Sequence, residues 1–353
     1  SLFSAGAGVD WTPDVFGGGR RRVEQARALV DYQRAQRRAA RLSLVGNTVL
    51  QAIALASTRE QLAAVEDILA ADERNLALVE LSAAAGKSAQ LDVLTARSQL
   101  SSDRALLPPL RQQASAARHA LAVLAGERAG NWSPPEIGFD ALAMPRELPL
   151  SLPSDWLRQR PDIEAAEAQL RAANAQVGIA TAALFPSFTL DGAWTATGRV
   201  PGRLFHAGTD VWSLAASLLA PVFDGGTLAA QRAAAVDAYA AQLAAYRLVL
   251  LQAFGQVADV LDQSRNDAAL LDVETQALDA AAATLALTRE GYRAGQASLV
   301  QLLDAQRLYE QARLGRARAL GQRFSDCAQW FIAMGEADDT GAAPVQATMR
   351  REP

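Results

Sequence analysis

The sequence is poor in the residues that carry most metal and enzyme chemistry. Its 353 residues include one cysteine, Cys327, and two histidines, His119 and His206. A single cysteine excludes a disulfide framework, and neither histidine has a second ligand at a zinc-binding spacing. We therefore expect no metal and no cofactor.

Long hydrophobic runs and aromatic residues are also scarce. Half of the residues are hydrophobic, but only 6% are aromatic. No stretch of about 18 residues is continuously apolar, which argues against a membrane-spanning helix. The chain nevertheless holds enough apolar surface to bury a core.

Proline is missing from two long regions. None occurs between Pro13 and Pro108, or between Pro221 and Pro344. Both gaps are filled with strong helix formers such as Ala, Leu, Gln, Arg and Glu. They predict helices over 19–85 and 227–293, each roughly 100 Å long, which is far beyond an ordinary globular helix.

Narrow apolar stripes run along these predicted helices. Apolar residues recur at alternating spacings of four and three, the pattern of a coiled-coil seam with close helix approach. The stripes are Val45, Val49, Ala52 and Ala56 in the first helix and Leu250, Phe254, Val257 and Leu261 in the second.

The chain also repeats itself. Val15-Phe16 aligns with Val222-Phe223, and the stretch from Leu76 aligns with the stretch from Leu285. Each long helix then ends at a glycine, Gly86 or Gly295, and a second helix follows over 91–126 or 300–335. Since glycine readily adopts the left-handed conformation past a helix end, the repeated unit is a long helical hairpin.

Three segments alternate with a period of two, as strands do. They lie at the start of the chain, over 187–197 and over 211–221. One face is apolar and the other is small and polar, which suits a transmembrane β-barrel, although an ordinary half-buried sheet has the same pattern. The residues expected to face lipid are Phe188, Leu190, Trp194, Trp212 and Leu214.

Three motifs resemble the TolC-type outer-membrane efflux proteins, in particular the NodT-like lipoprotein branch. They are "LPSDWLRQRPDIEAAEAQLRAANAQVGIATAALFPSFTL" from Leu152, "APVFDGG" from Ala220 and "YRAGQASLVQLLDAQR" from Tyr292. The resemblance implies a mainly α fold with transmembrane β. Long helical hairpins of three subunits would form a periplasmic α-barrel, and their strands would form a 12-stranded β-barrel.

The resemblance also implies a division of the chain. The first repeat lacks the helix and strand that precede the second hairpin, so we expect an N-terminally truncated chain whose lipid-anchoring cysteine lies upstream. The expected segments are a strand (1–15), a hairpin (16–128), a linker (129–153), a helix (154–185), two strands (186–222), a hairpin (223–336) and a tail (337–353).

The function implied is that of a passive channel, not an enzyme. A homotrimer in the outer membrane of a Gram-negative bacterium would contact outer-membrane lipid and conduct substrates received from an inner-membrane pump of the RND type. A periplasmic membrane-fusion adaptor would join the two proteins. The alternative is a soluble periplasmic coiled-coil adaptor or scaffold, which the three apolar-faced strands disfavour.

The second hairpin supplies the candidate gate. Val300, Asp304 and Arg307 share one helix face, and in the first repeat Asp92 stands where the second has Gln301. Three copies of Asp304 around a trimer axis would form a carboxylate ring that selects cations. By spacing alone, an exposed ion pair with no such role is the better explanation of Asp304 and Arg307, and the resemblance is what favours the gate.

Two further sets of residues follow from the resemblance. The expected adaptor contacts are the hairpin tips Gly86, Lys87, Ser88, Gly295, Gln296 and Ser298. The expected strand-to-helix junctions are Gly18, Gly19, Gly225 and Gly226.

Signals for other functions are weak. Gly86-Lys87-Ser88 lacks the first glycine and the preceding strand of a phosphate-binding loop. The arginine-rich stretch over 20–41 lies on an amphipathic helix of an acidic protein, so we read it as a solvated face and expect no nucleic acid. A helical-bundle enzyme would need inward-facing Glu-x-x-His pairs, and the sequence has none.

Overall fold

The computed structural model describes residues 2–130, 132–139, 160–200, 202, 208 and 210–335. Its contacts divide the chain into two compact units. The sheet unit comprises residues 1–37 and 161–252, and the hairpin unit comprises residues 38–160 and 253–353. The longest helices, α1 and α6, contribute to both units.

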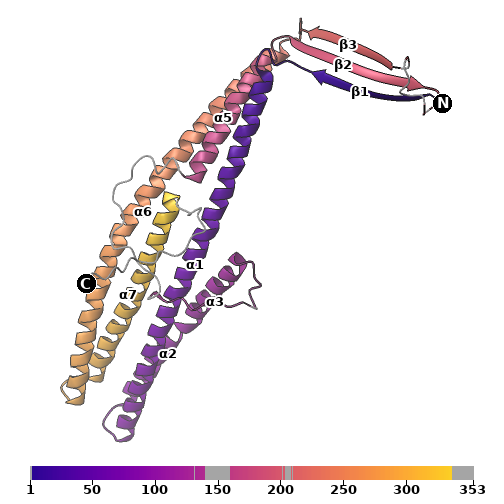
Figure 1. Cartoon of the computed structure of the whole chain (residues 1–353). Helices are drawn as coiled ribbons and strands as arrows, with labels where there is room; N and C mark the ends of the chain where they lie inside the picture. Colours follow the sequence, from indigo (N-terminus) through magenta and orange to yellow (C-terminus); the bar gives the residue numbers. More distant parts are fainter. Residues whose placement is uncertain are drawn as a thin grey trace, which may run out of the picture. The chain divides into compact units, whose positions relative to one another are not determined.

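Two helices dominate the chain (Figure 1). α1 (Gly18–Ala84) and α6 (Thr227–Arg293) have 67 residues each and begin and end within a residue of the bounds expected from the proline map. By length and composition alone, both helices could cross a membrane, although neither contains a continuously apolar run long enough to span one. At about 1.5 Å per residue, each is roughly three times longer than the bilayer core, so a simple spanning role does not follow.

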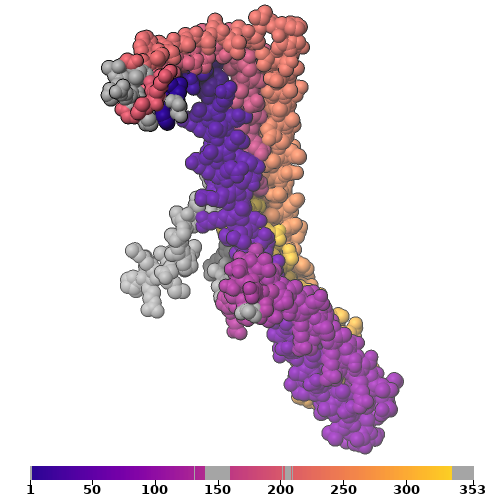
Figure 2. All heavy atoms as spheres, turned by 90° about the vertical axis from the view of Figure 1, so that its right-hand side faces the viewer, coloured from indigo at the N-terminus to yellow at the C-terminus, as the bar shows by residue number. Residues whose placement is uncertain are grey.

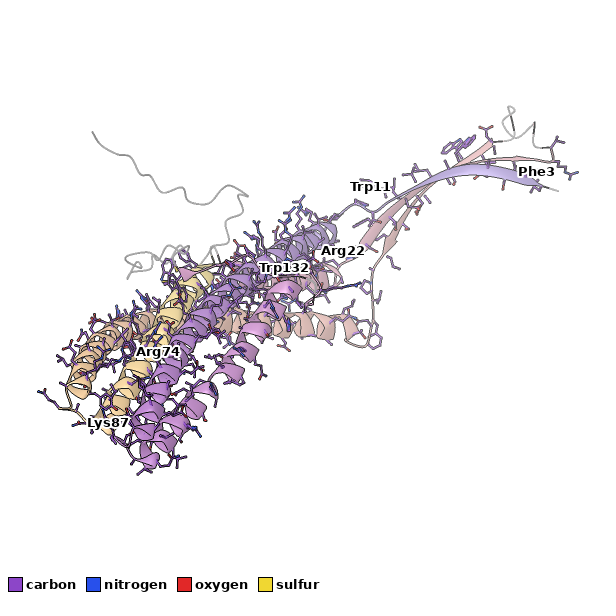
Figure 3. The ribbon with its side chains drawn as sticks, turned by 90° about the horizontal axis from the view of Figure 1, so that it is seen from below. Phe3, Trp11, Arg22, Arg74, Lys87 and Trp132 are labelled. Carbon is purple, nitrogen blue, oxygen red and sulfur yellow. The ribbon has the colours of Figure 1, made fainter. Side chains whose placement is uncertain are left out.

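The sheet unit contains one antiparallel sheet in the order β1-β2-β3. β1 spans Phe3–Trp11, the residues labelled at its two ends in Figure 3. β2 spans Ser187–Gly198 and β3 spans Asp210–Leu219. Trp194 lies opposite Ala7 on β1 and Trp212 on β3, while Asp191 lies opposite Asp10.

This register sorts the side chains onto two faces, because directly opposed residues share a face. Asp10, Thr195 and Ser213 belong to the small and polar face. The other face carries the large apolar residues Val9, Trp11, Phe188, Leu190, Trp194, Trp212, Leu214 and Leu218. All of these apolar side chains are exposed in the single chain.

Helix α5 (Pro161–Ala182) packs against the first turns of α1 and α6 within the sheet unit (Figure 1). Its first residue is proline, which suits a position whose N–H has no partner in the helix. Gln176 accepts a hydrogen bond from Gln25 on α1 at 2.9 Å, and Gln169 accepts one from Gln242 on α6 at 2.8 Å. Four alanines form its buried stripe: Ala165, Ala168, Ala172 and Ala175.

The second arm of the first hairpin consists of two helices, α2 (Gln90–Arg104) and α3 (Leu107–Leu124). The helical segment expected over 91–126 is thus divided at Pro108-Pro109, where two prolines predict an interruption. Pro108 and Pro109 lie in the first turn of α3. Since proline has no N–H to continue the hydrogen-bond ladder, the helix stops before them and restarts.

The second arm of the second hairpin is the single helix α7 (Leu299–Met334). The buried face of α7 packs against both long helices within the hairpin unit. Phe324 packs on Ile53 of α1 and stacks on Phe139 with ring centroids 4.6 Å apart. Trp330 packs on Val257 and Val260 of α6.

The predicted seams are only partly buried. Ala56 and Val257 are buried, but Val45, Val49 and Phe254 are exposed in the single chain. The packing within one chain therefore covers only part of each stripe. Several expected segments lie outside the described residues: most of the linker, the start of the 154–185 helix, most of the loop after Arg199 and the tail over 337–353.

Candidate functional site

The first hairpin tip is a glycine turn between α1 and α2. The N–H of Lys87 donates to the carbonyl of Ser82, and that of Gly86 donates to Ala83, both at 2.9 Å. This pair of bonds satisfies the last carbonyls of α1 and requires a left-handed residue, which Gly86 supplies with φ 72°. Lys87 is exposed and lies at the end of the hairpin, where Figure 3 labels it. In Figure 2 the end of this hairpin, in purple, is open at the surface.

The second tip repeats this geometry. Gln296 donates its N–H to Gly291 at 2.8 Å, Gly295 donates to Tyr292 at 3.1 Å, and Gly295 also has φ 72°. Gly295, Gln296 and Ser298 are exposed. The repeat seen in the sequence thus produces two turns of the same type.

Both tips are followed by a capped helix. At α7, Gln301 donates its N–H to the Ser298 hydroxyl, and its side-chain oxygen accepts from the Ser298 N–H at 2.8 Å. At α2, the Asp92 carboxylate accepts from the N–H of Ala89 at 3.1 Å. Asp92 and Gln301 therefore share the same capping role, which their alignment in the two repeats could have indicated.

The proposed gate residues project from the exposed face of α7. Val300 is 68% exposed, and the side chains of Asp304 and Arg307 are 57% and 51% exposed. Arg307 donates to Asp304 at 2.6 Å. The opposite face carries Leu299 and Leu302, which pack into the core. The structure thus brings Val300, Asp304 and Arg307 together and leaves Asp92 in a separate cap.

The strand-to-helix junctions differ more than the repeated glycines suggest. Gly225 and Gly226 both have positive φ, whereas Gly18 and Gly19 do not and belong to α1 itself. In the first junction the left-handed residue is Gly17. Each junction also contains an aspartate that accepts backbone N–H bonds from the start of the helix. Asp14 accepts from Gly19 and Arg20. Asp224 accepts from Gly226 and Leu228.

These backbone hydrogen bonds lower the pKa of both Asp14 and Asp224. The reason is that the N–H groups stabilise the carboxylate form. The charged side chains also suit the positive end of a helix dipole. Neither aspartate is among the predicted junction residues, although an aspartate just before a long helix is a typical capping signal.

A buried acidic cluster was also missed. Asp72, Asp103 and Glu310 interrupt the apolar seams of α1, α2 and α7, and a carboxylate oxygen of each lies within 4.8 Å of the others. The sequence does carry a signal for this cluster, which is an acidic residue at a seam position. Asp72 continues the four-and-three spacing of Val65 and Leu69. Their mutual proximity could not be read from one helix alone.

The family model described as "Outer membrane efflux protein" matches residues 1–127 and 152–335. The pyoverdine export outer membrane protein OpmQ of Pseudomonas aeruginosa is 36% identical over 90% of this chain and 68% of its own length. Nodulation protein T of Rhizobium leguminosarum bv. trifolii is 29% identical over 96% of this chain and 71% of its own length.

The fold has a solved counterpart in the outer-membrane channel OprN. It superposes with a TM-score of 0.87 at 27% sequence identity, over 95% of this chain and 81% of that chain. The match includes the long hairpins that the resemblance to TolC-type channels implied. The family's members are channels and not enzymes. This chain therefore belongs to the outer membrane efflux protein family, a family of channels in the outer membrane of Gram-negative bacteria with a large periplasmic helical part.

Proposed function

We propose that this protein is the homotrimeric outer-membrane channel of a tripartite efflux system. An inner-membrane pump of the RND type would deliver substrates, and a periplasmic adaptor would connect the pump to the hairpin tips. Conduction through the channel would be passive. The soluble scaffold considered from the sequence is the less favoured reading, since the family consists of outer-membrane channels.

The observation that carries the proposal is the exposed apolar surface of the long helices. In their most apolar windows, only 22% of α1 and 6% of α6 is buried within one chain. On α6, Leu248, Leu251 and Phe254 are all more than half exposed. A monomer rarely exposes so much contiguous apolar surface, so we infer that neighbouring subunits cover it.

The first test is the mass of the full-length protein by size-exclusion chromatography with light scattering. We expect a detergent-dependent particle of three chains. A monodisperse monomer or dimer in buffer without detergent would contradict the channel proposal and favour the scaffold.

We assign the gate to Val300, Asp304 and Arg307 of α7. Threefold symmetry would repeat their exposed face around the channel axis, so each constriction residue would occur three times. Carboxylates arranged in a ring attract cations and repel anions. Each arginine, held at 2.6 Å, would fix the orientation of its carboxylate within the ring.

The gate can be tested by single-channel recording in planar bilayers. Asp304→Ala combined with Arg307→Ala should raise the conductance and weaken the cation preference, because the polar constriction is removed. The matched control is Asp262→Ala with Arg265→Ala, another exposed pair one helical turn apart, on α6. Unchanged conductance and selectivity in the first variant would remove Asp304 and Arg307 from the gate.

The adaptor would contact the two tips through Gly86, Lys87, Ser88, Gly295, Gln296 and Ser298. The two turns have the same backbone geometry, so a single type of adaptor hairpin could dock on both. The exposed glycines permit close approach of a partner helix. Lys87, the only lysine, adds a positive charge to the first tip, and Arg293 at the end of α6 adds one beside the second.

A further inference from the structure

Three helices of the hairpin unit each place an acidic residue at a buried seam position. Asp72 follows Val65 and Leu69 on α1, and Asp103 follows Leu100 on α2. On α7, Glu310 lies one turn after the buried Gln306. The three acidic residues are only 4%, 8% and 5% exposed. A seam normally buries apolar side chains, so three carboxylates at one level need a specific explanation.

The carboxylates converge on one another. One oxygen from each of Asp72, Asp103 and Glu310 lies within 4.8 Å of the other two. Asp72 Oδ2 and Glu310 Oε1 are buried, and neither has a hydrogen-bond partner among the residues that the structure describes. Buried polar atoms are nearly always paired, so these two oxygens require a partner that the protein does not supply.

Neighbouring amides hold the other oxygens in place. Gln306 Nε2 donates to Asp72 Oδ1 at 2.5 Å, and Gln99 Nε2 donates to Asp103 Oδ2 at 2.8 Å. Asn75 in turn donates to Gln306. These bonds orient the acidic groups without neutralising them, because an amide carries no net charge.

Two arginines that follow cluster residues in sequence are bonded elsewhere. Arg104 pairs with Glu73 at 2.8 Å, and Arg313 pairs with Asp67 at 2.5 Å. The cluster therefore requires protons or a cation to offset its charge.

We propose that Asp72, Asp103 and Glu310 together bind one Ca²⁺ ion between α1, α2 and α7. Carboxylate oxygens are preferred ligands of hard divalent cations, and the cluster contains no histidine or cysteine for a softer metal. Ca²⁺–O distances allow oxygens on opposite sides of the ion to lie about 5 Å apart, and the three oxygens lie within that span. Mg²⁺ demands near-ideal octahedral geometry and usually keeps several waters, so three protein carboxylates suit Ca²⁺ better.

The bound ion would join the two hairpins of one subunit. Asp72 and Asp103 belong to the first hairpin, and Glu310 belongs to the second. Loss of the ion would leave mutually repelling carboxylates between them. Since all three ligands come from one chain, the site does not depend on the proposed trimer.

The binding test uses the full-length protein in detergent, stripped with EDTA and dialysed at pH 8. Equilibrium dialysis with radioactive Ca²⁺ should give one ion per chain. Asp72→Asn and Glu310→Gln should each lower the affinity at least about tenfold, because each removes a charged ligand. Asp262→Asn, which changes an exposed acid on α6, should leave binding unchanged.

Thermal melting separates a ligand role from a folding defect. In EDTA, Asp72→Asn should melt no lower than the wild type, because it removes buried charge repulsion. Added Ca²⁺ should raise the melting temperature of the wild type and not that of the variant.

Three outcomes would overturn the proposal. They are no saturable Ca²⁺ binding, binding of Mg²⁺ in place of Ca²⁺, and stability that rises toward acidic pH without any response to Ca²⁺. The last outcome would mean that protons alone neutralise the cluster.

Discussion

At the scale of single residues, two glycines allow α7 to approach α1 closely. A Cβ at Gly46 would lie 2.6 Å from Ile332 Cδ1, and one at Gly321 would lie 2.6 Å from Ser57 Cβ. Both distances are too short for carbon atoms in contact. The helices could not keep this packing if either position carried a side chain.

The first prediction concerns Gly321. Gly321→Leu should destabilise the hairpin unit by about 1–3 kcal/mol, because a side chain there overpacks the α1–α7 contact. Thermal melting in detergent would measure the change. The control is Gly255→Ala on α6, where a Cβ meets open space within the chain. A melting temperature of Gly321→Leu equal to or above that of the wild type would refute the packing argument.

The second prediction concerns Asp326, which is fully buried on α7. Burial raises its pKa to about 6 from an ordinary value of 3.8, and the Asp267 carboxyl adds to the effect. The unfolded chain thus binds fewer protons than the folded chain between about pH 4 and pH 6. Asp326 therefore adds to the free energy of unfolding while it is protonated. This stabilisation is fully present below about pH 4 and is lost as the pH rises through 6.

Asp326→Asn should remove this part of the pH dependence. In EDTA, the free energy of unfolding of the wild type should fall by roughly 1–3 kcal/mol between pH 4 and pH 7 because Asp326 loses its proton. The variant should not show this fall. Chemical denaturation at a series of pH values would measure the difference. Parallel pH profiles for the two proteins would show that Asp326 does not titrate in this range.

At the scale of elements, the strand register makes the two faces of the sheet testable separately. Leu214 and Ser213 are neighbours on β3 but belong to opposite faces. Leu214 is 68% exposed on the apolar face, where we expect lipid. Its neighbour lies on the polar face, where a barrel would enclose water.

The third prediction compares arginine at these two positions. Leu214→Arg should cost up to about 2–4 kcal/mol if it lies near the bilayer midplane, because a charge would be placed in hydrocarbon. Ser213→Arg should cost much less. Refolding yield into lipid vesicles would measure both variants. Equal yields, or a larger loss for Ser213→Arg, would argue against lipid on the apolar face.

At the scale of the whole molecule, the exposed apolar surface of α6 is the feature that one chain cannot explain. Phe254 is 54% exposed although it belongs to the predicted seam. An aromatic side chain in that position contributes strongly when another subunit covers it. The channel would thus be stable only as an assembly.

The fourth prediction places a charge in this surface. Phe254→Glu should weaken or abolish the trimer, because a carboxylate would be buried between subunits without a partner. Light scattering in detergent would report the mass. Gln263→Glu, at an exposed polar position on the same helix, should keep three chains. A stable trimer of Phe254→Glu would place this face outside the subunit contacts.

The sequence by itself determined the long helices, the hairpin tips, the strands and the family. Missing prolines set the bounds of α1 and α6, because helix breaking depends on the residue and its neighbours alone. Gly86 and Gly295 marked the tips for the same local reason, and alternation indicated the strands. The short motifs from Leu152, Ala220 and Tyr292 were enough to indicate the family.

Only the tertiary structure decided which distant residues meet. The pairing of Trp194 with Trp212 depends on strand register, and the meeting of Asp72, Asp103 and Glu310 depends on how three helices pack. The capping hydrogen bond of Asp92, a predicted gate residue, likewise depends on where α2 begins. Local patterns specify helices and turns, but contacts between distant segments arise from packing, which no single segment encodes.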